Sequence, residues 1–287
     1  MKTLLLISML LTSQAWAGWS VSQYNIRNFN KDPGAGETNL AQLGQNLKAF
    51  KSDVMSFVEV VNTNAFNTVI QTNLPGYVSQ ISSCGGFGKQ KLAVVFNPKV
   101  FKFISSAEDM TFSGSTNKCA SLRPALIVTL EHIATKKAYV FAALHLKAGG
   151  AENAMRTRWS QYQLLARLAT VYANQNLILL GDLNTTGYNI KDADYDNFQS
   201  LLAVSKMTTT SQNLHCTSYW EGTLGNGLHQ SSILDHIIVK NTMAKDVTGV
   251  EVGAHCAKLN CVDATPADLG VDYQSVSDHC PIQVTFK

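Results

Sequence analysis

The sequence predicts one ordered domain of the α/β (α+β) class with its sheets in the interior. Eight strand-like runs are spread along the chain, and most are apolar at consecutive positions, as is typical of strands covered on both faces. Segments with helical spacing lie between some of them, and no repeat, low-complexity tract or proline-rich linker marks a domain boundary. The 287 residues, 45% hydrophobic and 15% charged, are enough for one large globular domain.

The first 17 residues have the features of a signal peptide. In "MKTLLLISMLLTSQAWA" a Lys near the start precedes an apolar run that is too short to span a bilayer, and the segment ends in an A-x-A site. We expect cleavage after Ala17, export to the periplasm or the medium, and a mature domain over 18–287. No later apolar run approaches membrane length, so we expect no stable membrane association.

The predicted strands are short runs rich in apolar residues. They cover 19–26, 53–60, 91–96, 125–130, 138–146, 177–183, 233–239 and 281–286. Helical spacing predicts helices over 38–51 and 153–173. The apolar stripe of the second helix is Met155, Trp159, Tyr162, Ala166, Ala169 and Ala173. The stretch 241–276 has little regular pattern, and we expect long loops there.

Six cysteines in an exported chain indicate a set of disulfides. Cys256 and Cys261 flank a short loop and form one expected pair. Cys84 and Cys119 bracket a hairpin-like segment and form the second. The plain alternative for Cys280 is a small, buried apolar residue.

Polar residues recur near the ends of the strand-like runs. They are Asn25, Glu59, His145, Lys147, Asp182 and Asn184, with Asp235 inside its run and the pair Asp278-His279 before the last strand. Each has an ordinary explanation, such as a turn residue for Asn25 or a core histidine for His145, and His236 is expected to be a core histidine. Burying the whole set without compensation costs several kcal/mol for each group. A cation or a shared hydrogen-bond network is therefore expected.

Seven motifs follow one another along the chain in this order: "YNIRNF", "SFVEV", "RPAL", "LHLKAGG", "GDLNT", "LDHI" and "SDHCPI". With these motifs the chain resembles the endonuclease/exonuclease/phosphatase superfamily, which includes deoxyribonuclease I. The motifs run from Asn25 to Ile282, and "GDLN" and "SDHCPI" are the most specific. The resemblance implies a four-layered α/β sandwich, in which two mixed β-sheets pack face to face with helices outside.

The resemblance also implies a metal site. Glu59 is the expected principal ligand, with Asn25 and Asp278 nearby. Mg²⁺ is the favoured ion and Ca²⁺ or Mn²⁺ are possible, because hard cations prefer oxygen ligands.

The same resemblance assigns the catalytic groups. His279 is implied as a general base or a phosphate-stabilising group, and Asp235 holds its ring. Asp182 orients or deprotonates the attacking water. Asn184 donates a hydrogen bond to a phosphate oxygen, and His145 contacts the phosphate or the leaving oxygen.

Two cations are expected to bind phosphate oxygens, Arg123 and Lys147. A solvated strand-edge arginine is the plain alternative for Arg123. One position departs from the deoxyribonuclease branch, in which a carboxylate partners the first histidine. Here Gln90 stands at that position, and it can hydrogen-bond His145 but supplies no charge.

The function implied is that of a secreted, divalent-metal-dependent phosphodiesterase, with an endonuclease acting on DNA favoured over RNA and a monomer expected. The net charge of +3 carries little weight. Basic residues close to the motifs are candidates to follow a phosphate backbone: Lys89, Lys91, Arg123, Lys147, Arg156 and Arg158. For Arg156, a solvated helix face is the alternative.

Two other interpretations of the function remain open. A phosphatase or a sphingomyelinase-type phosphodiesterase of the same superfamily would carry the same core residues, although the sequence has no clear exposed aromatic hairpin for a membrane. The second interpretation is a non-catalytic or toxin-complex subunit on the same scaffold. The full set of polar residues argues against a decayed site.

Overall fold

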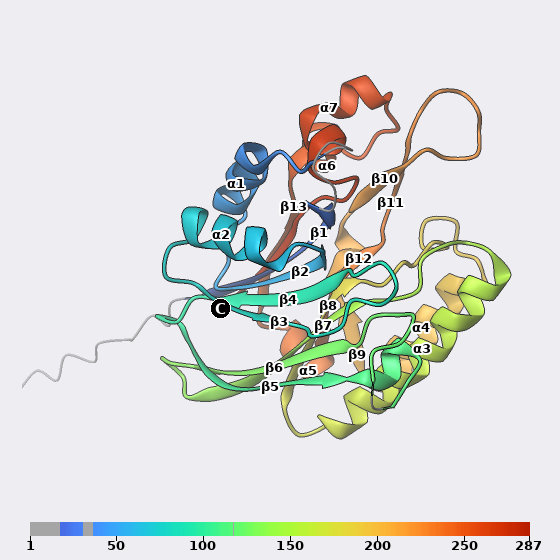
Figure 1. The fold of residues 1–287 in the computed structure, drawn as a ribbon. Coiled ribbons are helices and arrows are strands. Elements are labelled where there is room, and N and C mark those ends of the chain that lie inside the picture. The colour runs from blue at the N-terminus through green and yellow to red at the C-terminus, as the bar shows by residue number, and fades with distance from the viewer. Residues whose placement is uncertain (1–17, 31–36, 117) are drawn as a thin grey trace, which may run out of the picture.

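Two mixed β-sheets of six strands each pack face to face, and helices cover their outer faces (Figure 1). The computed structural model describes residues 18–30, 37–116 and 118–287, so the expected signal peptide lies outside the described residues. The architecture confirms the predicted four-layered α/β sandwich. None of the helices in these ranges is long and apolar enough to cross a membrane.

Each sheet is built around one pair of parallel strands. The first sheet has the order β13-β14-β1-β2-β4-β3, and the second has the order β5-β6-β7-β8-β12-β9. The strands of the first sheet are β1 (Trp19–Phe29), β2 (Val54–Val60), β3 (Val78–Ile81), β4 (Lys91–Phe96), β13 (Val247–Val252) and β14 (Ile282–Phe286). Those of the second are β5 (Phe101–Asp109), β6 (Ala125–His132), β7 (Lys137–His145), β8 (Asn176–Asp182), β9 (Met207–Thr209) and β12 (Asp235–Lys240).

The remaining elements connect or cover the sheets. The helices are α1 (Leu40–Ala49), α2 (Thr63–Asn73), α3 (Glu152–Val171), α4 (Ala193–Ser205), α5 (Asn241–Ala244), α6 (Ala254–Lys258) and α7 (Pro266–Ser275). Two 3₁₀ turns are η1 (Met110–Ser113) and η2 (Thr210–Asn213). A separate two-stranded ribbon is formed by β10 (Ser218–Trp220) and β11 (Gln230–Ser232).

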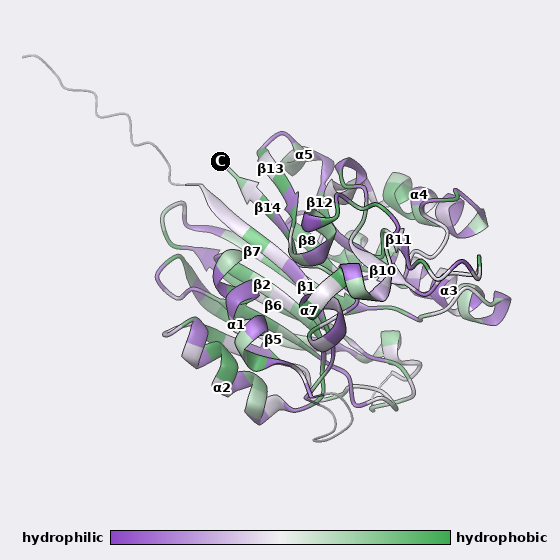
Figure 2. Cartoon of the chain, turned by 90° about the horizontal axis from the view of Figure 1, so that it is seen from above, coloured by the Kyte–Doolittle hydropathy of each residue, from purple (hydrophilic) through white to green (hydrophobic). Residues whose placement is uncertain are grey.

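Apolar side chains fill the space between the sheets and the space under each helical layer. Between the sheets, one buried cluster includes Val21 of β1, Val128 of β6 and Phe141 of β7. Figure 2 shows hydrophobic stretches along the interior strands and hydrophilic stretches on the surrounding helices. Because both faces of these strands are covered, their sequences are apolar at consecutive positions.

All the predicted strands and both predicted helices are present, with their ends shifted by a few residues. The expectation of long loops in 241–276 is wrong, because this stretch contains α5, β13, α6 and α7. These helices are short, and β13 is an edge strand with exposed positions, so neither gives a clear apolar repeat.

The predicted apolar stripe of α3 is only partly correct. Tyr162 and Ala169 are buried, but Met155 and Trp159 are only half-buried. The buried face instead includes the polar residue Arg158. An apolar pattern alone cannot find a helix face that is partly polar.

Three disulfides join the described cysteines: Cys84–Cys119, Cys216–Cys261 and Cys256–Cys280. The first confirms the predicted pair. The predicted Cys256–Cys261 bond is wrong, because α6 directs Cys256 into the buried cluster that contains Cys280 while Cys261 stays half-exposed. Cys280 is buried, in agreement with its interpretation as a small buried residue, but it forms a disulfide and is not free.

The strand registers bring the polar strand ends to one edge of the sandwich. In the parallel pair β7–β8, His145 lies opposite Asp182, and in the parallel pair β1–β2, Asn25 lies opposite Val58, next to Glu59. The antiparallel strand β12 begins at Asp235, which lies opposite Asp182. Asp235 is therefore the first residue of its strand and not a residue in the middle of it, and this places it at the same edge.

Candidate active site

Asn25 links the carboxylates of the two sheets. Its Nδ2 atom donates to Glu59 Oε1 at 3.1 Å and to Asp182 Oδ2 at 3.0 Å. Its Oδ1 atom accepts from the backbone N–H of Arg27 at 2.9 Å. Asn25 is 1% exposed, so both carboxylates are held by a fixed amide.

Two histidines lie on either side of Asp182. The Nε2 atom of His145 is 3.6 Å from Asp182 Oδ2, and the Nε2 atom of His279 is 3.7 Å from the same oxygen. His145 Nε2 is also 3.7 Å from Glu59 Oε1. A single carboxylate oxygen thus faces both imidazoles and the amide of Asn25.

Asp235 fixes the orientation of His279. The Nδ1–H of His279 donates to Asp235 Oδ2 at 2.6 Å, and Gln23 Nε2 donates to Asp235 Oδ1 at 3.4 Å. Since an ionised carboxylate only accepts, Nδ1 carries the proton and Nε2 faces Asp182. Asp235 is fully buried, so its charge acts on the imidazole at low dielectric.

Burial and neighbouring charges separate the pKa values of the site. Burial raises the pKa of Asp182 to about 7, against the opposing positive charge of His279. Burial by itself lowers the pKa of His279, but the carboxylates of Asp235 and Asp182 outweigh it and raise that pKa well above its usual value. Burial also lowers the pKa of His145 well below its usual value, with Arg123 adding to the effect. The pair His279 and His145 therefore consists of one cation and one neutral ring near pH 7.

A bulge in the first sheet aims Glu59 into the site. The register of β1 and β2 shifts between Asn25 and Phe29, and Glu59 has a φ of +68°. Such a backbone is unfavourable for a residue with a side chain, and bulges of this kind redirect side chains next to functional sites. Glu59 Oε2 accepts from the backbone N–H of Asn28 at 2.8 Å, which holds the carboxylate in this direction.

The "GDLN" motif has a steric reason for its glycine. A Cβ atom at Gly181 would lie 2.0 Å from the carbonyl oxygen of Leu144 on β7. Only glycine therefore allows the close approach of β7 and β8 that places His145 beside Asp182. Asn184 has a φ of +52°, its backbone N–H donates to Asp182 Oδ1 at 2.9 Å, and its Nδ2 donates to Leu146 O at 3.3 Å.

Asp278 lies beside His279 but is less tightly held. It is half-buried, and within the described ranges its carboxylate makes no hydrogen bond or ion pair with another side chain. Its backbone oxygen accepts from the N–H of Tyr219 at 2.9 Å, which ties this segment to β10.

The two predicted phosphate-binding cations differ in their surroundings. Arg123 is 9% exposed, so it is not a solvated strand-edge arginine. Its Nε donates to His145 O at 3.1 Å, and its guanidinium also bonds Leu146 O, which places a positive charge under the end of β7. Lys147 is half-buried, and its Nζ donates to Ala148 O.

Gln90 does not contact His145. Its Nε2 donates to Asn28 Oδ1 at 2.9 Å, and the buried Nδ1 of His145 has no hydrogen-bond partner among the described residues. The expectation that Gln90 could partner His145 is therefore wrong. Gln90 instead contacts Asn28, whose backbone N–H holds Glu59.

Arg158 is a structural residue and not part of a surface that follows a phosphate backbone. It is fully buried, and its Nε and NH2 atoms donate to Asp194 at 3.0–3.2 Å. Its NH1 donates to the carbonyl oxygens of Lys147 and Gly149, and its NH2 donates to Thr186 Oγ1. It thus fixes the loops that follow β7 and β8. Its predicted role as a backbone-contacting cation is wrong.

Three supporting residues were not predicted from the sequence. Gln23 holds Asp235, Asn28 holds Glu59, and Asp194 pairs with Arg158. For Gln23 the available signal was a polar side chain inside the apolar run "SVSQYNI". Asn28 acts through its backbone N–H, which the sequence does not reveal. His236, in contrast, is a core histidine as predicted, with its ring nitrogens 2.8 and 2.9 Å from Thr185 Oγ1 and Thr209 Oγ1.

An acidic and histidine cluster able to hold a divalent cation is present. The ligand atoms of Asp182, Asp235 and His279 all lie within 4.8 Å of one another. However, His279 Nδ1 is already bonded to Asp235, and both carboxylates are almost completely buried. Mg²⁺ keeps several waters and needs oxygen ligands open to solvent. Glu59, whose side chain is 12% exposed, and the half-buried Asp278 meet this requirement better.

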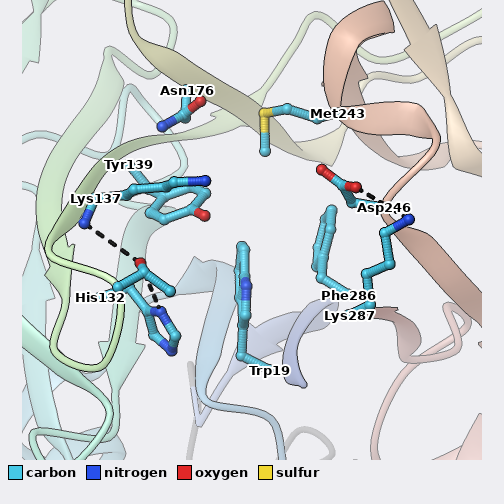
Figure 3. Close-up of a pocket in the computed structure, with 10 residues that line it drawn as sticks. Trp19, His132, Lys137, Tyr139, Asn176, Met243, Asp246, Phe286 and Lys287 are labelled. Atoms are coloured by element: carbon cyan, nitrogen blue, oxygen red, sulfur yellow. Dashed lines mark hydrogen bonds and ion pairs between the residues drawn. The ribbon is translucent and has the colours of Figure 1, made fainter. Parts of the chain in front are cut away.

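A different cavity lies at the opposite end of β1. It has a volume of about 410 Å³, and Trp19 and Phe286 stack at its floor with ring centroids 4.3 Å apart (Figure 3). Asp246 and Lys287 form an ion pair at its rim. Asn25 is six residues further along β1, about 20 Å away at the usual rise of a strand. None of the predicted site residues lines this cavity.

Comparisons with known proteins agree with this architecture. A model of the Endonuclease/Exonuclease/phosphatase family matches residues 22–279. No curated protein matched the sequence. Solved structures that resemble the chain include TDP2 from D. rerio, humanized by 14 mutations, with a TM-score of 0.67, 18% identity and coverage of 94% of this chain and 99% of that one.

Two further structures show the range of proteins with this fold. The human Nocturnin catalytic domain has a TM-score of 0.64 and 18% identity, and each chain is covered to 94%. A mannosyl-6-phosphatase from Bacteroides thetaiotaomicron has a TM-score of 0.58 and 20% identity, with 93% of this chain and 98% of that one covered. At these identities the likeness concerns the fold.

Proposed function

The chain belongs to the Endonuclease/Exonuclease/phosphatase family, and on that premise we propose that it is a divalent-metal-dependent phosphodiesterase that hydrolyses nucleic acid, with DNA favoured. The observation that carries the proposal is the convergence on Asp182 Oδ2 of Asn25, His145 and His279, which come from three distant parts of the chain. Burying such a set without compensating charges or hydrogen bonds costs several kcal/mol, and buried groups with shifted pKa values cluster at functional sites.

The roles of the central groups follow from their protonation. Asp182, with a pKa near 7, is suited to take a proton from the attacking water. His279, held as a cation by Asp235, presents its Nε2–H to a nonbridging phosphate oxygen. His145, which is neutral, is suited to donate a hydrogen bond to the phosphate or the leaving oxygen. Asn184 has an amide nitrogen in the same region for a phosphate oxygen.

Glu59 and Asp278 are the residues proposed to hold Mg²⁺, and Ca²⁺ or Mn²⁺ are alternatives. The bound cation would neutralise charge that develops on the phosphate and the leaving oxygen. The Nδ2 of Asn25 faces Glu59 and Asp182, so its first role in our proposal is to hold both carboxylates. Arg123 and Lys147 supply further positive potential beside the end of β7.

A nucleic acid substrate is supported by a structural likeness. D. rerio TDP2, solved in complex with a single strand DNA product, has a TM-score of 0.66 with this chain at 16% identity, with 94% of this chain and 99% of that one covered. We also propose export, since three disulfides are typical of proteins from oxidising compartments. A monomer remains our expectation.

The test is hydrolysis of circular DNA, both double-stranded and single-stranded, with MgCl₂ or with EDTA. We expect cleavage with Mg²⁺, none with EDTA, and a loss of activity in His279→Ala. A parallel series with RNA, a sugar phosphate and sphingomyelin separates the nuclease from a phosphatase or a sphingomyelinase. Full Mg²⁺-dependent activity of His279→Ala would refute the mechanism, and tight partner binding without any turnover would favour a non-catalytic subunit.

A further inference from the structure

A cavity of about 770 Å³ opens beside the proposed active site, between the loops after β7 and β8 and the β10–β11 ribbon. It is within the usual size range of small-molecule and cofactor sites. The residues that line it are Gly149, Gly150, Met155, Thr186, Ile190, Asp192, Trp220, Thr223, Gln230, Ser232 and Leu234. We refer to it as the Trp220 pocket.

The walls of the Trp220 pocket are continuous with the catalytic groups. Leu234 precedes Asp235, and Thr186 follows Asn184 by two residues. The ribbon is joined to the catalytic histidine itself, because Ser218 at the start of β10 forms a β-bridge with His279. The pocket and the catalytic groups are therefore built on the same loops and the same ribbon.

The lining combines apolar side chains with hydroxyl and amide groups. Trp220 is 45% exposed and Ile190 is 76% exposed, which are large exposures for side chains of this type. Gln230 lies directly opposite Trp220 across the ribbon. A Cβ atom at position 222 would lie 2.7 Å from Gln230 Cγ, so Gly222 leaves room for the glutamine side chain beside the indole.

The charge of the lining indicates which part of a substrate it receives. Of the described residues that line the pocket, none is Lys or Arg, and the one charged residue is Asp192. The Asp192 carboxylate already caps α4 by accepting from the N–H groups of Asp194 and Tyr195. A second phosphate is disfavoured here, and an alkyl chain would leave the hydroxyl and amide groups of the lining unpaired.

We propose that the Trp220 pocket binds one unpaired nucleobase next to the scissile phosphate, so that the preferred substrate is single-stranded nucleic acid. The inference rests on the proposed function. A nucleobase is flat and uncharged, can stack on the exposed indole, and has edge groups that can bond Gln230, Thr223 and Ser232. In a duplex, both faces of the base are stacked and its edge is paired, so the base cannot enter.

The test is binding in EDTA, measured by fluorescence anisotropy, so that it does not depend on turnover. The probes are a labelled oligothymidylate, an oligomer of equal length and charge in which tetrahydrofuran replaces every nucleoside, and a blunt duplex. The variants are Trp220→Ala, Trp220→Phe and Leu224→Ala. Leu224 is 63% exposed in the loop of the same ribbon and does not line the pocket, so it is the matched control.

We expect Trp220→Ala to weaken oligothymidylate binding about 5- to 150-fold, the usual range for the loss of one stacked base. Trp220→Phe keeps an aromatic face and should stay closer to the parent protein, and Leu224→Ala should be unchanged. The abasic oligomer and the duplex should bind the parent protein and Trp220→Ala equally. Equal affinity of both proteins for oligothymidylate would overturn the inference, as would the same loss for the abasic oligomer or the duplex.

Hydrolysis of bis(4-nitrophenyl) phosphate by the parent protein with Mg²⁺ or Mn²⁺ tests the proposed function separately. Hydrolysis without a Trp220-dependent preference for bases would remove the pocket inference alone. A Trp220-dependent preference without hydrolysis of any phosphodiester would remove the catalytic proposal and leave a single-strand binding site.

Discussion

Asp235 and His279, 44 residues apart in the sequence, are joined by a hydrogen bond of 2.6 Å between Oδ2 and Nδ1. The register of β12 against β8 also places Asp235 opposite Asp182, which faces the other ring nitrogen of His279. The imidazole is therefore held between two carboxylates, and its cationic form is stabilised from both sides.

We predict that Asp235→Asn lowers kcat for nucleic acid cleavage by about 10²- to 10⁴-fold, the usual contribution of a positioned acid or base. The variant keeps the shape of the side chain and removes its charge, so the pKa of His279 should fall. Activity assays combined with NMR titration of the imidazole check both effects. Asp246→Asn, at the far end of the sandwich, should change neither. An unchanged His279 titration in Asp235→Asn would contradict this account.

We predict that Mg²⁺ raises the melting temperature of the protein and that Glu59→Gln removes this shift. A cation at 100 times its Kd stabilises the folded state by about 2.7 kcal/mol if it does not bind the unfolded chain. Scanning calorimetry in MgCl₂ and in EDTA measures the shift without reference to activity. Glu108→Gln is a suitable control, because Glu108 bonds Ser83 outside the site. The same Mg²⁺ shift in Glu59→Gln would remove Glu59 from the metal site.

The sequence was sufficient for most of the fold because its core strands are covered on both faces. Runs such as 91–96 and 125–130 carry apolar residues at nearly every position, and they were found with small errors in their ends. β5 was missed because most of its residues are exposed, and β10 and β11 are three residues each. Their positions are set by pairing with distant strands, which local patterns do not report.

For the site, the residue types could be predicted from the sequence, but the point at which they meet depends on the strand register. Asn25, His145 and Asp182 stand near the ends of strand-like runs in the sequence, but only the strand pairing brings Asn25 and His145 within 4 Å of Asp182. Arg158 was misassigned because a charged residue on a helix normally faces solvent. Its burial depends on Asp194, 36 residues away, and on the carbonyl oxygens of a loop.

We predict that Asp194→Asn lowers the free energy of unfolding by about 3 to 5 kcal/mol, because it leaves the buried guanidinium of Arg158 without a counter-charge. Arg158→Lys should also destabilise the protein, since a lysine cannot make the forked contacts to Asp194 and to the loop carbonyls. Urea denaturation measures both variants. Arg156→Ala is the control: its exposed pair with Glu152 contributes about 0.5 kcal/mol or less. Losses as small as that of the control would show that the buried pair is dispensable.

We predict that two disulfides differ in their effect on catalysis. Replacing either Cys256 and Cys280 or Cys84 and Cys119 with alanine should lower stability by about 2 to 5 kcal/mol. Only the first change should also lower kcat, because Cys280 follows His279 directly. Urea denaturation and kinetics at a temperature where both variants are folded separate the two effects. Equal kcat values in the two double variants would show that the Cys256–Cys280 bond does not position His279.

We predict that the buried His236 makes the protein less stable as the pH falls below about 6.5. Burial lowers the pKa of His236 to about 3, so the folded state keeps the ring neutral where the unfolded chain binds a proton. Its contribution is therefore complete above the unfolded pKa and is lost as the pH falls toward the folded pKa, at about 1.4 kcal/mol per pH unit. Urea denaturation between pH 7 and pH 4.5 gives this slope.

His236→Gln should be less stable at pH 7, because two threonine contacts are lost, but its stability should fall less steeply as the pH is lowered. The parent slope in His236→Gln would assign the acid sensitivity to other groups.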